Sequence, residues 1–268
     1  MSQNTKALRV RIKSVNSTMQ LTNAMGLVAS SKIRRANEAM LRGRDYMTAL
    51  EHAIAVLSAD RDCLKSPYMR EREPRRTKII VIAGDRGLAG GYNANVFRLA
   101  SEYPDAEFIP IGKRACERYE QTPVSSEHFS FAEAARLADE LCTDFAEEKF
   151  DRLGIIATKY HSIMSQEACI KWILPLQKGE KDHVGGTVFE PDQLTVLDHV
   201  VREYVAGIIT VCVRESFASE VSARRMAMDS ASKNAQQMIS DLQLAYNRAR
   251  QGAITQEITE IVAGSGNG

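Results

Sequence analysis

The sequence predicts an α/β protein that combines an antiparallel coiled coil of long N- and C-terminal helices with a small central open α/β sheet domain. All seven prolines lie between Pro67 and Pro191, and a proline-free stretch permits an uninterrupted helix. Both proline-free ends space their apolar side chains by three and four residues, which is typical of helices. The middle instead alternates short apolar runs with helical segments, as α/β domains do. These observations divide the chain into residues 1–66, 67–191 and 192–268.

The first helix is predicted over Lys6–Leu57, which would make it about 75–80 Å long at about 1.5 Å per residue. Gly26 and Gly43 lie inside it and each costs about 1 kcal/mol relative to alanine, which weakens the prediction without overturning it. The predicted apolar stripe comprises Leu8, Ile12, Val15, Met19, Thr22, Met25, Val28, Met40, Met47, Leu50, Ile54 and Leu57.

The last helix has a more regular pattern, which predicts the seam of a left-handed coiled coil. Many of its seam residues are small, so two backbones can approach closely while little apolar area is buried. Neither end is stable with its stripe exposed, and antiparallel pairing of the two ends is the economical solution. The alternative is that each helix packs on the central domain as part of an ordinary bundle. The predicted seam is Ala218, Val221, Arg225, Met228, Ser232, Ala235, Ile239, Leu242, Tyr246, Ala249 and Ala253.

The central segment predicts a small, Rossmann-like open sheet with mostly parallel strands. In its last strand, Ala168, Ile170, Trp172 and Leu174 are expected on one face, as in an antiparallel edge strand. The predicted elements are a strand at Ile79–Ala83, a helix at Asn93–Ser101, a strand at Ala106–Ile111, a helix at Phe131–Lys149, strands at Leu153–Ala157 and Ser165–Leu174, and a surface loop at Lys178–Pro191.

Charge is unevenly distributed although the net charge is only +1. Residues 1–58 contain nine Lys and Arg against three Asp and Glu, so a basic first helix and an acidic partner surface are predicted. Five cysteines without a CxxC pair indicate reduced, mostly buried thiols in a cytoplasmic protein. No apolar stretch is long enough to predict a membrane span, and the N-terminus lacks the pattern of a signal peptide.

No catalytic, metal-binding or cofactor-binding pattern emerges from the sequence. The glycine-rich segment Gly84–Gly91 follows a predicted strand, but it matches neither GxxxxGK[ST] nor GxGxxG, so a structural turn is favoured over a nucleotide site. The histidines show no metal-ligand spacing. The basic groups at Lys32–Arg35 and Arg224–Arg225 lack interleaved aromatic residues, which disfavours binding of nucleic acid.

Three segments resemble the gamma subunit of F-type, proton-translocating ATP synthases. Tyr246–Gly264 resembles that family's C-terminal signature, and Thr22–Lys32 resembles part of its N-terminal helix. Asp85–Gly91 together with Asn93 resembles its central-domain loop. The signature positions are Ile254, Thr255, Glu257, Glu260 and Gly264 at the C-terminus, and Asp85, Arg86, Gly87, Gly90 and Gly91 in the loop.

The resemblance implies a central rotor shaft that is itself non-catalytic. Such a shaft couples ion-driven rotation of a membrane ring to ATP synthesis or hydrolysis at the catalytic sites of beta subunits. The implied partners are three alpha and three beta subunits, epsilon and the c-ring, without nucleic acid, metal, cofactor or a direct membrane span. The sequence has no transit-peptide pattern and no redox cysteine pair in a regulatory insert, which favours a peripheral location at the cytoplasmic face of a bacterial plasma membrane over an organellar one.

The resemblance also implies two sets of contacts with beta. Arg250, Gln251 and Thr255 would meet a catch loop, while Met25, Lys32 and Arg224 would meet acidic lever loops. A stand-alone coiled-coil adaptor and an α/β nucleotide-binding enzyme are the other function classes that the pattern allows. Neither accounts for the C-terminal signature.

Overall fold

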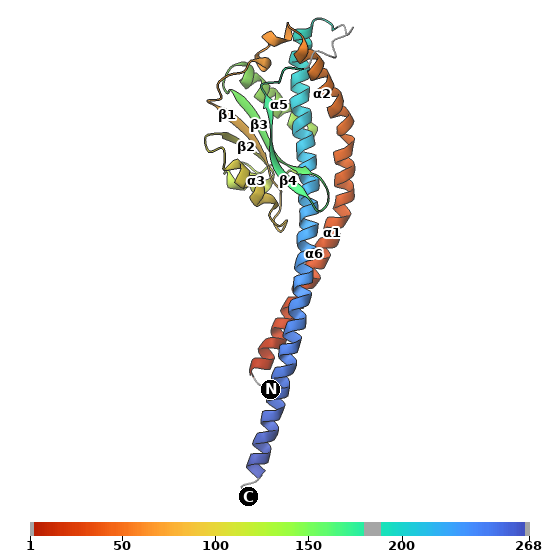
Figure 1. The fold of residues 1–268 in the computed structure, drawn as a ribbon, viewed down its shortest axis with the longest axis vertical. Coiled ribbons are helices and arrows are strands. Elements are labelled where there is room, and N and C mark those ends of the chain that lie inside the picture. The colour runs from red at the N-terminus through yellow and green to blue at the C-terminus, as the bar shows by residue number, and fades with distance from the viewer. Residues whose placement is uncertain (1–2, 180–188, 266–268) are drawn as a thin grey trace. The chain divides into compact units, whose positions relative to one another are not determined.

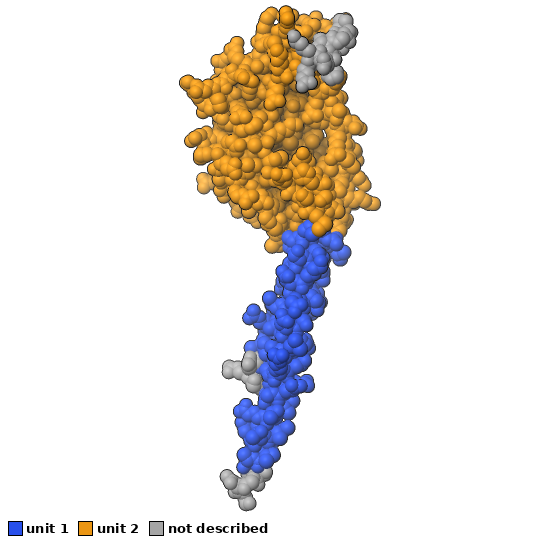
Figure 2. All heavy atoms as spheres, in the orientation of Figure 1, with its two compact units in different colours: residues 1–29, 225–268 blue, residues 30–224 orange. Residues whose placement is uncertain are grey.

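The computed structural model describes residues 3–179 and 189–265, so part of the predicted loop at 178–191 lies outside the described residues. The described residues form two compact units, unit 1 from residues up to 29 and from 225 onward, and unit 2 from residues 30–224 (Figure 2). Among the described residues, no helix has an apolar stretch that could cross a bilayer.

In chain order the elements are α1 (Gln3–Arg42), α2 (Arg44–Ala59), two short 3-10 helices (Cys63–Lys65 and Pro67–Met69), β1 (Thr77–Ile82), α3 (Tyr92–Ala100), β2 (Glu107–Ile111), α4 (Lys113–Arg118), α5 (Phe131–Ala146), β3 (Arg152–Tyr160), β4 (Gln166–Leu174) and α6 (Gln193–Ser265) (Figure 1).

Unit 2 contains a four-stranded sheet with the strand order β2-β1-β3-β4. β1 runs parallel to both β2 and β3, and β4 pairs antiparallel with β3. The predicted open sheet with an antiparallel edge strand is therefore confirmed. Its strands form because β1 and β3 are short apolar runs that are covered on both faces.

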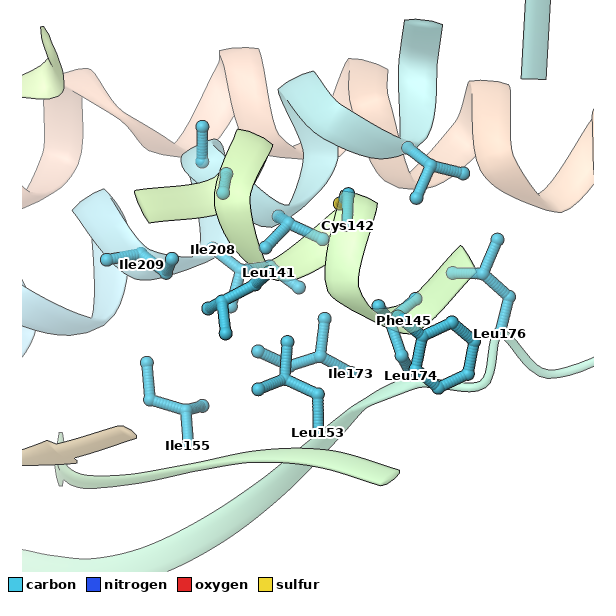
Figure 3. Close-up of a cluster of buried hydrophobic side chains, with 14 of the residues drawn as sticks. Leu141, Cys142, Phe145, Leu153, Ile155, Ile173, Leu174, Leu176, Ile208 and Ile209 are labelled. Atoms are coloured by element: carbon cyan, nitrogen blue, oxygen red, sulfur yellow. The ribbon is translucent and has the colours of Figure 1, made fainter. Parts of the chain in front are cut away.

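The two faces of the sheet carry separate cores. On one face, α5 and the first half of α6 pack on β3, with Leu141, Phe145, Leu153 and Ile208 among the buried side chains (Figure 3). On the other face, α3 and α4 cover residues such as Ile79. The alternative in which a terminal helix packs on the central domain is thus correct for this part of α6.

The end of β4 differs from the prediction because the ladder is irregular there. Gly154 pairs with Trp172, whereas the neighbouring Leu153 pairs with Leu174, so Ile173 is the additional residue of a bulge. A bulge shifts the side-chain alternation by one residue. Leu174 consequently packs in the core on the face opposite Trp172, and the prediction of one shared face was wrong for Leu174.

The predicted first helix occurs as two elements that meet at Gly43. Gly43 keeps helical backbone angles, with φ −84° and ψ −12°, and its carbonyl accepts a hydrogen bond of 3.0 Å from the Met47 amide. A Cβ at Gly43 would lie 3.2 Å from Cγ2 of Val211 on α6. This glycine therefore permits a close approach between two helices of unit 2.

In unit 1, the two chain ends pair directly with each other. The hydroxyl oxygens of Thr22 and Ser232 lie 2.7 Å apart, and a Cβ on Gly26 would lie 3.6 Å from the Cβ of Met228. The predicted antiparallel pairing of the ends is confirmed by these contacts. Along α6 the less exposed positions recur as predicted, at Ala235, Ile239, Leu242, Tyr246, Ala249 and Ala253.

The seam of α1 departs from the predicted stripe after Thr22. Gly26 and Ala29 are buried, whereas Val28 is 57% exposed. From Thr22 the buried seam of α1 advances by four residues to Gly26 and then by three to Ala29. The small residues Gly26 and Ala29 therefore face α6, and the larger Val28 does not. The inclusion of Val28 in the stripe was therefore wrong.

Candidate functional site

The sheet offers one position where α/β proteins commonly bind ligands. In open α/β sheets, that position lies beyond the carboxyl ends of the strands, where the strand order reverses. Here the order reverses between β1 and β3, because β2 lies on one side of β1 and β3 on the other. The glycine-rich segment 84–91 follows β1 at this edge.

Side chains of α6 occupy this crevice. The Thr158 amide, near the end of β3, donates a hydrogen bond of 3.1 Å to the Ser216 hydroxyl. The Ser219 hydroxyl donates to the Thr158 carbonyl at 3.3 Å. The Tyr92 hydroxyl, at the start of α3, donates to the Ser216 carbonyl at 2.9 Å. The α6 helix therefore occupies the position where a ligand binds in other open α/β sheets. This explains why the segment after β1 is rich in glycine but has no nucleotide-binding motif.

Glu220 and Arg224, one turn apart on α6, hold the segment after β1. Nη2 of Arg224 donates to Glu220 Oε1 at 2.6 Å and to the carbonyl of Gly87 at 3.1 Å. The Glu220 carboxyl is buried beside Gly84, in space that a larger residue would fill. Burial raises the pKa of Glu220, although the Arg224 guanidinium opposes that shift.

Asp85 connects the same segment to two other parts of unit 2. Its carboxylate accepts hydrogen bonds from the Ser125 hydroxyl at 2.5 Å, from the Ser126 amide at 2.9 Å and from the Lys113 amide at 3.1 Å. The Glu127 amide adds a fourth bond at 3.2 Å. Burial acts to raise the pKa of Asp85, but these four donors outweigh it, and the net shift is downward.

The remaining residues of the predicted loop set have backbone roles. The Arg86 carbonyl accepts a hydrogen bond from the Asn93 side-chain amide at 3.3 Å, and the Asn93 side-chain oxygen accepts from the Gly84 amide at 2.9 Å. Gly90 has a φ of 58°, a conformation that glycine adopts at little cost. Gly91 directly precedes α3. The structure therefore brings Arg224, predicted for the lever-loop set, to Gly87 of the predicted central-domain loop set.

Lys32 on α1 forms an ion pair with Glu127, the residue whose amide contacts Asp85. Its ammonium group also lies 6.0 Å from the ring centroid of Phe217. Met25, the other α1 residue of the predicted lever-loop set, belongs to unit 1 and is half-buried.

The predicted catch-loop residues lie near the C-terminal end of α6. Arg250, Gln251 and Thr255 are exposed, and the Thr255 hydroxyl donates to the Gln251 carbonyl at 3.0 Å. From Ile254 to Ala263 every residue is exposed, including the apolar side chains of Ile254, Ile258, Ile261 and Val262. The C-terminal signature positions Glu257, Glu260 and Gly264 lie in the same final turns of the helix.

Sequence reasoning missed Glu220 and Ser216. Both read as ordinary polar residues of an amphipathic helix, and their partners are far away in the sequence. The only signal in the sequence was the presence of the polar residues Ser219, Glu220 and Ser222 next to Ala218 and Val221, two positions of the predicted seam. Among the described residues, no cluster of three or more His, Cys, Asp or Glu side chains could hold a metal ion.

The chain is similar to known proteins over almost its whole length. A protein-family model described as ATP synthase matches residues 4–266. An ATP synthase gamma chain from Ruminococcus albus is 39% identical over 284 residues, and one from Geobacter sp. (strain M21) is 35% identical over 280 residues. Each comparison covers 98% of both chains.

Solved structures show a similar fold at lower sequence identity. A chain of the Euglena gracilis mitochondrial ATP synthase, in an OSCP/F1/c-ring structure, is 20% identical with a TM-score of 0.69, covering 97% of this chain and 93% of that chain. A chain of the Tetrahymena thermophila mitochondrial ATP synthase central stalk and c-ring is 19% identical with a TM-score of 0.62, covering 79% and 99% respectively. These structures show the same fold, and the family match and the two bacterial relatives show that the chain belongs to the family of ATP synthase gamma chains.

Proposed function

We propose that this chain is the central rotor shaft of an F-type ATP synthase. It couples ion-driven rotation of a membrane ring to ATP synthesis or hydrolysis at catalytic sites on beta subunits, and is itself non-catalytic. The single observation that carries the proposal is the pairing of α6, a helix of 73 residues, with α1 in a chain that belongs to the gamma family. A paired helix resists twisting better than a single one and so suits a part that transmits torque.

The exposed end of α6 supports a surrounding sleeve of partner subunits. An isolated helix draws little stability from its own backbone, yet Ile254, Ile258 and Ile261 are exposed there. Exposed apolar side chains that recur on a helix are typical of a surface that a partner covers. We assign this role to three alpha and three beta subunits, within which the end of α6 would turn.

The coupling follows from unequal contacts between one shaft and three equivalent partners. A single asymmetric helix end touches each beta subunit differently, so the three nucleotide sites differ in affinity at any one angle. Rotation exchanges these states, and each angle therefore carries a coupling free energy. From the resemblance to the family's C-terminal signature we propose Arg250, Gln251 and Thr255 as contacts with a catch loop of beta, and the exposure of all three side chains supports this.

We further propose Met25, Lys32 and Arg224 as contacts with acidic loops of beta. Lys32 keeps about a third of its side chain exposed, so it can meet a second carboxylate without losing Glu127. For Arg224, such a contact would compete with its bonds to Glu220 and Gly87.

We propose that unit 2 contacts epsilon and the c-ring, and that the complex lies at the cytoplasmic face of a bacterial plasma membrane with this chain as a peripheral subunit. The bacterial relatives support the location.

Copurification and rotation test the proposal together. The tagged full chain is coexpressed with alpha and beta subunits of the same source, and the purified complex is immobilised through beta. We expect alpha, beta and this chain in a 3:3:1 ratio, and rotation of a probe on this chain when ATP is added. A chain that purifies alone would favour the adaptor, and nucleotide binding by the isolated chain in calorimetry would favour the enzyme.

A further inference from the structure

The occupied crevice holds one face of α6 by directional contacts. Ser219 and Glu220 lie three and four residues after Ser216, and Arg224 lies four residues after Glu220, so the four side chains share a helix face. All four form hydrogen bonds, and their partners outside α6 lie in Thr158, Tyr92 and the segment after β1. The fold thus binds its own helix where related sheets bind a ligand.

We propose that this crevice fixes the rotational angle of α6 about its own axis relative to the sheet, with Asp85, Glu220 and Arg224 as positioning residues. The inference rests on the proposed rotor function, because a fixed angle matters only in a part that transmits torque. It adds to that function the claim that the sheet is fixed to α6 at one rotational angle.

Apolar packing sets this angle only to within the width of the buried stripe of α6, and hydrogen bonds define it more narrowly. Val205, Ile208 and Ile209 bury α6 against the sheet, but hydrophobic contacts are non-directional. Hydrogen bonds weaken steeply when the donor is misaligned, and a buried network is stronger than a solvated one. Glu220 and Arg224 both lie on α6, so their ion pair would survive a turn of this helix. The bonds that α6 makes to Thr158 and to the Gly87 carbonyl would be lost.

A second connection ties the same segment to α1. Asp85 accepts the Glu127 amide, and the Glu127 carboxylate pairs with Lys32. The segment after β1 is therefore linked to both long helices, to α6 through Arg224 and to α1 through Glu127. In the sequence, Lys32 and Arg224 lie close to the limits of unit 2, which runs from Ser30 to Arg224.

The exposure of Arg224 also favours an internal role. Its side chain is only 12% exposed, and its guanidinium donates to Glu220, Gly87 and the Arg86 carbonyl. These bonds hold the guanidinium within unit 2, so a contact with beta would have to share Arg224 with them. Its internal bonds would be lost if it turned outward.

The test measures how firmly the sheet is joined to the helices. Complexes of the full chain with alpha and beta are immobilised through beta, and a probe is attached to a cysteine introduced at exposed Glu102. The angular variance of the probe is recorded during pauses, together with the rate of ATP hydrolysis. The variants are Asp85→Asn and Tyr92→Phe, and the control is Asp229→Asn, which removes a carboxylate paired with Lys233 on α6 itself.

We expect a larger angular variance in Asp85→Asn and Tyr92→Phe, with ATP hydrolysis and the control close to wild type. Wild-type variance in both variants would overturn the inference while leaving the rotor function intact. A wild-type complex that fails to assemble or rotate would instead contradict the rotor function. Asp85→Asn removes the negative charge and one of the two oxygens that accept the four bonds, and it can prevent folding. In that case Tyr92→Phe, which removes a single hydroxyl, decides the question.

Discussion

A Cβ atom added to Gly84 would lie 2.6 Å from the Cδ atom of Glu220. The glycine is therefore required by the carboxyl group that faces it, and not by a left-handed backbone conformation, because its φ is not positive. The carboxyl cannot move away easily, because Arg224 holds it at 2.6 Å and its surroundings are buried.

We predict that Gly84→Ala lowers the free energy of unfolding by about 1–3 kcal/mol, the usual cost of overpacking a buried site. Gly252→Ala is the matched control, because a Cβ there meets nothing within 4 Å and alanine favours a helix by about 1 kcal/mol. Urea unfolding of the full chain, followed by circular dichroism, measures both. Equal destabilisation by the two changes would mean that Glu220 does not restrict position 84.

The same cluster predicts two pH dependences of opposite sign. The pKa of Asp85 is lowered from its ordinary value of 3.8 by its hydrogen-bond donors, which outweigh the effect of burial. Its ionised form therefore stabilises the folded chain above pH 3.8, and that contribution is lost as the pH falls through the lowered pKa. Asp85→Asn should therefore lose stability relative to wild type as the pH rises from the lowered pKa toward 3.8, and the difference should level off above that range.

Glu220 should show the reverse. Burial raises its pKa above the ordinary value of 4.5 despite the nearby Arg224, so the unfolded chain releases this proton first. The free energy of unfolding of Glu220→Gln should therefore increase relative to wild type as the pH rises above 4.5. Unfolding of the wild type and both variants between pH 3 and 7 tests the pair, and slopes of the same sign would contradict the assignment.

Much of the architecture could be predicted because its signals are local. Ile79–Ala83 and Leu153–Ala157 are apolar on both faces, as strands covered on both sides must be. The seam of α6 could be predicted because three- and four-residue spacing persists from Ala235 to Ala253. Each of these patterns depends only on neighbouring residues.

The errors arise where a distant partner decides the outcome. Leu174 changes face because of the bulge opposite Leu153 and Gly154, next to the close approach of Trp172, whose Cζ3 would lie 2.8 Å from a Cβ added to Gly154. Val28 is exposed because close pairing of α1 selects small residues at Gly26 and Ala29. The Glu220 carboxyl fits into its buried position because Gly84, in a different segment of the chain, has no side chain. None of these partners can be identified from the spacing of residues along one helix or strand.

The exposed end of α6 makes a prediction about assembly. Ile258 and Leu244 are both 56% exposed on the same helix, but only Ile258 lies in the segment where every residue is exposed. We expect Ile258→Ser to weaken copurification with alpha and beta, with a loss of about 1–2 kcal/mol for an isoleucine that a partner buries. Leu244→Ser should have little effect, and equal losses would mean that the end of α6 is not a special contact surface.

The last prediction concerns Gln251, which is exposed and lies in the proposed catch-loop set. Gln251→Leu removes both polar atoms at similar size, so we expect coupled ATP synthesis in membrane vesicles to fall while unit 2 remains folded. The loss should be modest, since a single exposed hydrogen bond contributes about 0.5–1.5 kcal/mol, which corresponds to a factor of about 2–13 in an equilibrium. Gln243→Leu, an exposed glutamine on the same helix, is the control. If Gln251→Leu and Gln243→Leu reduce synthesis equally, the added surface hydrophobicity explains the loss, and no specific contact with beta is needed. The role would also be contradicted if Gln251→Leu lowers the unfolding temperature of the isolated chain as strongly as it lowers synthesis.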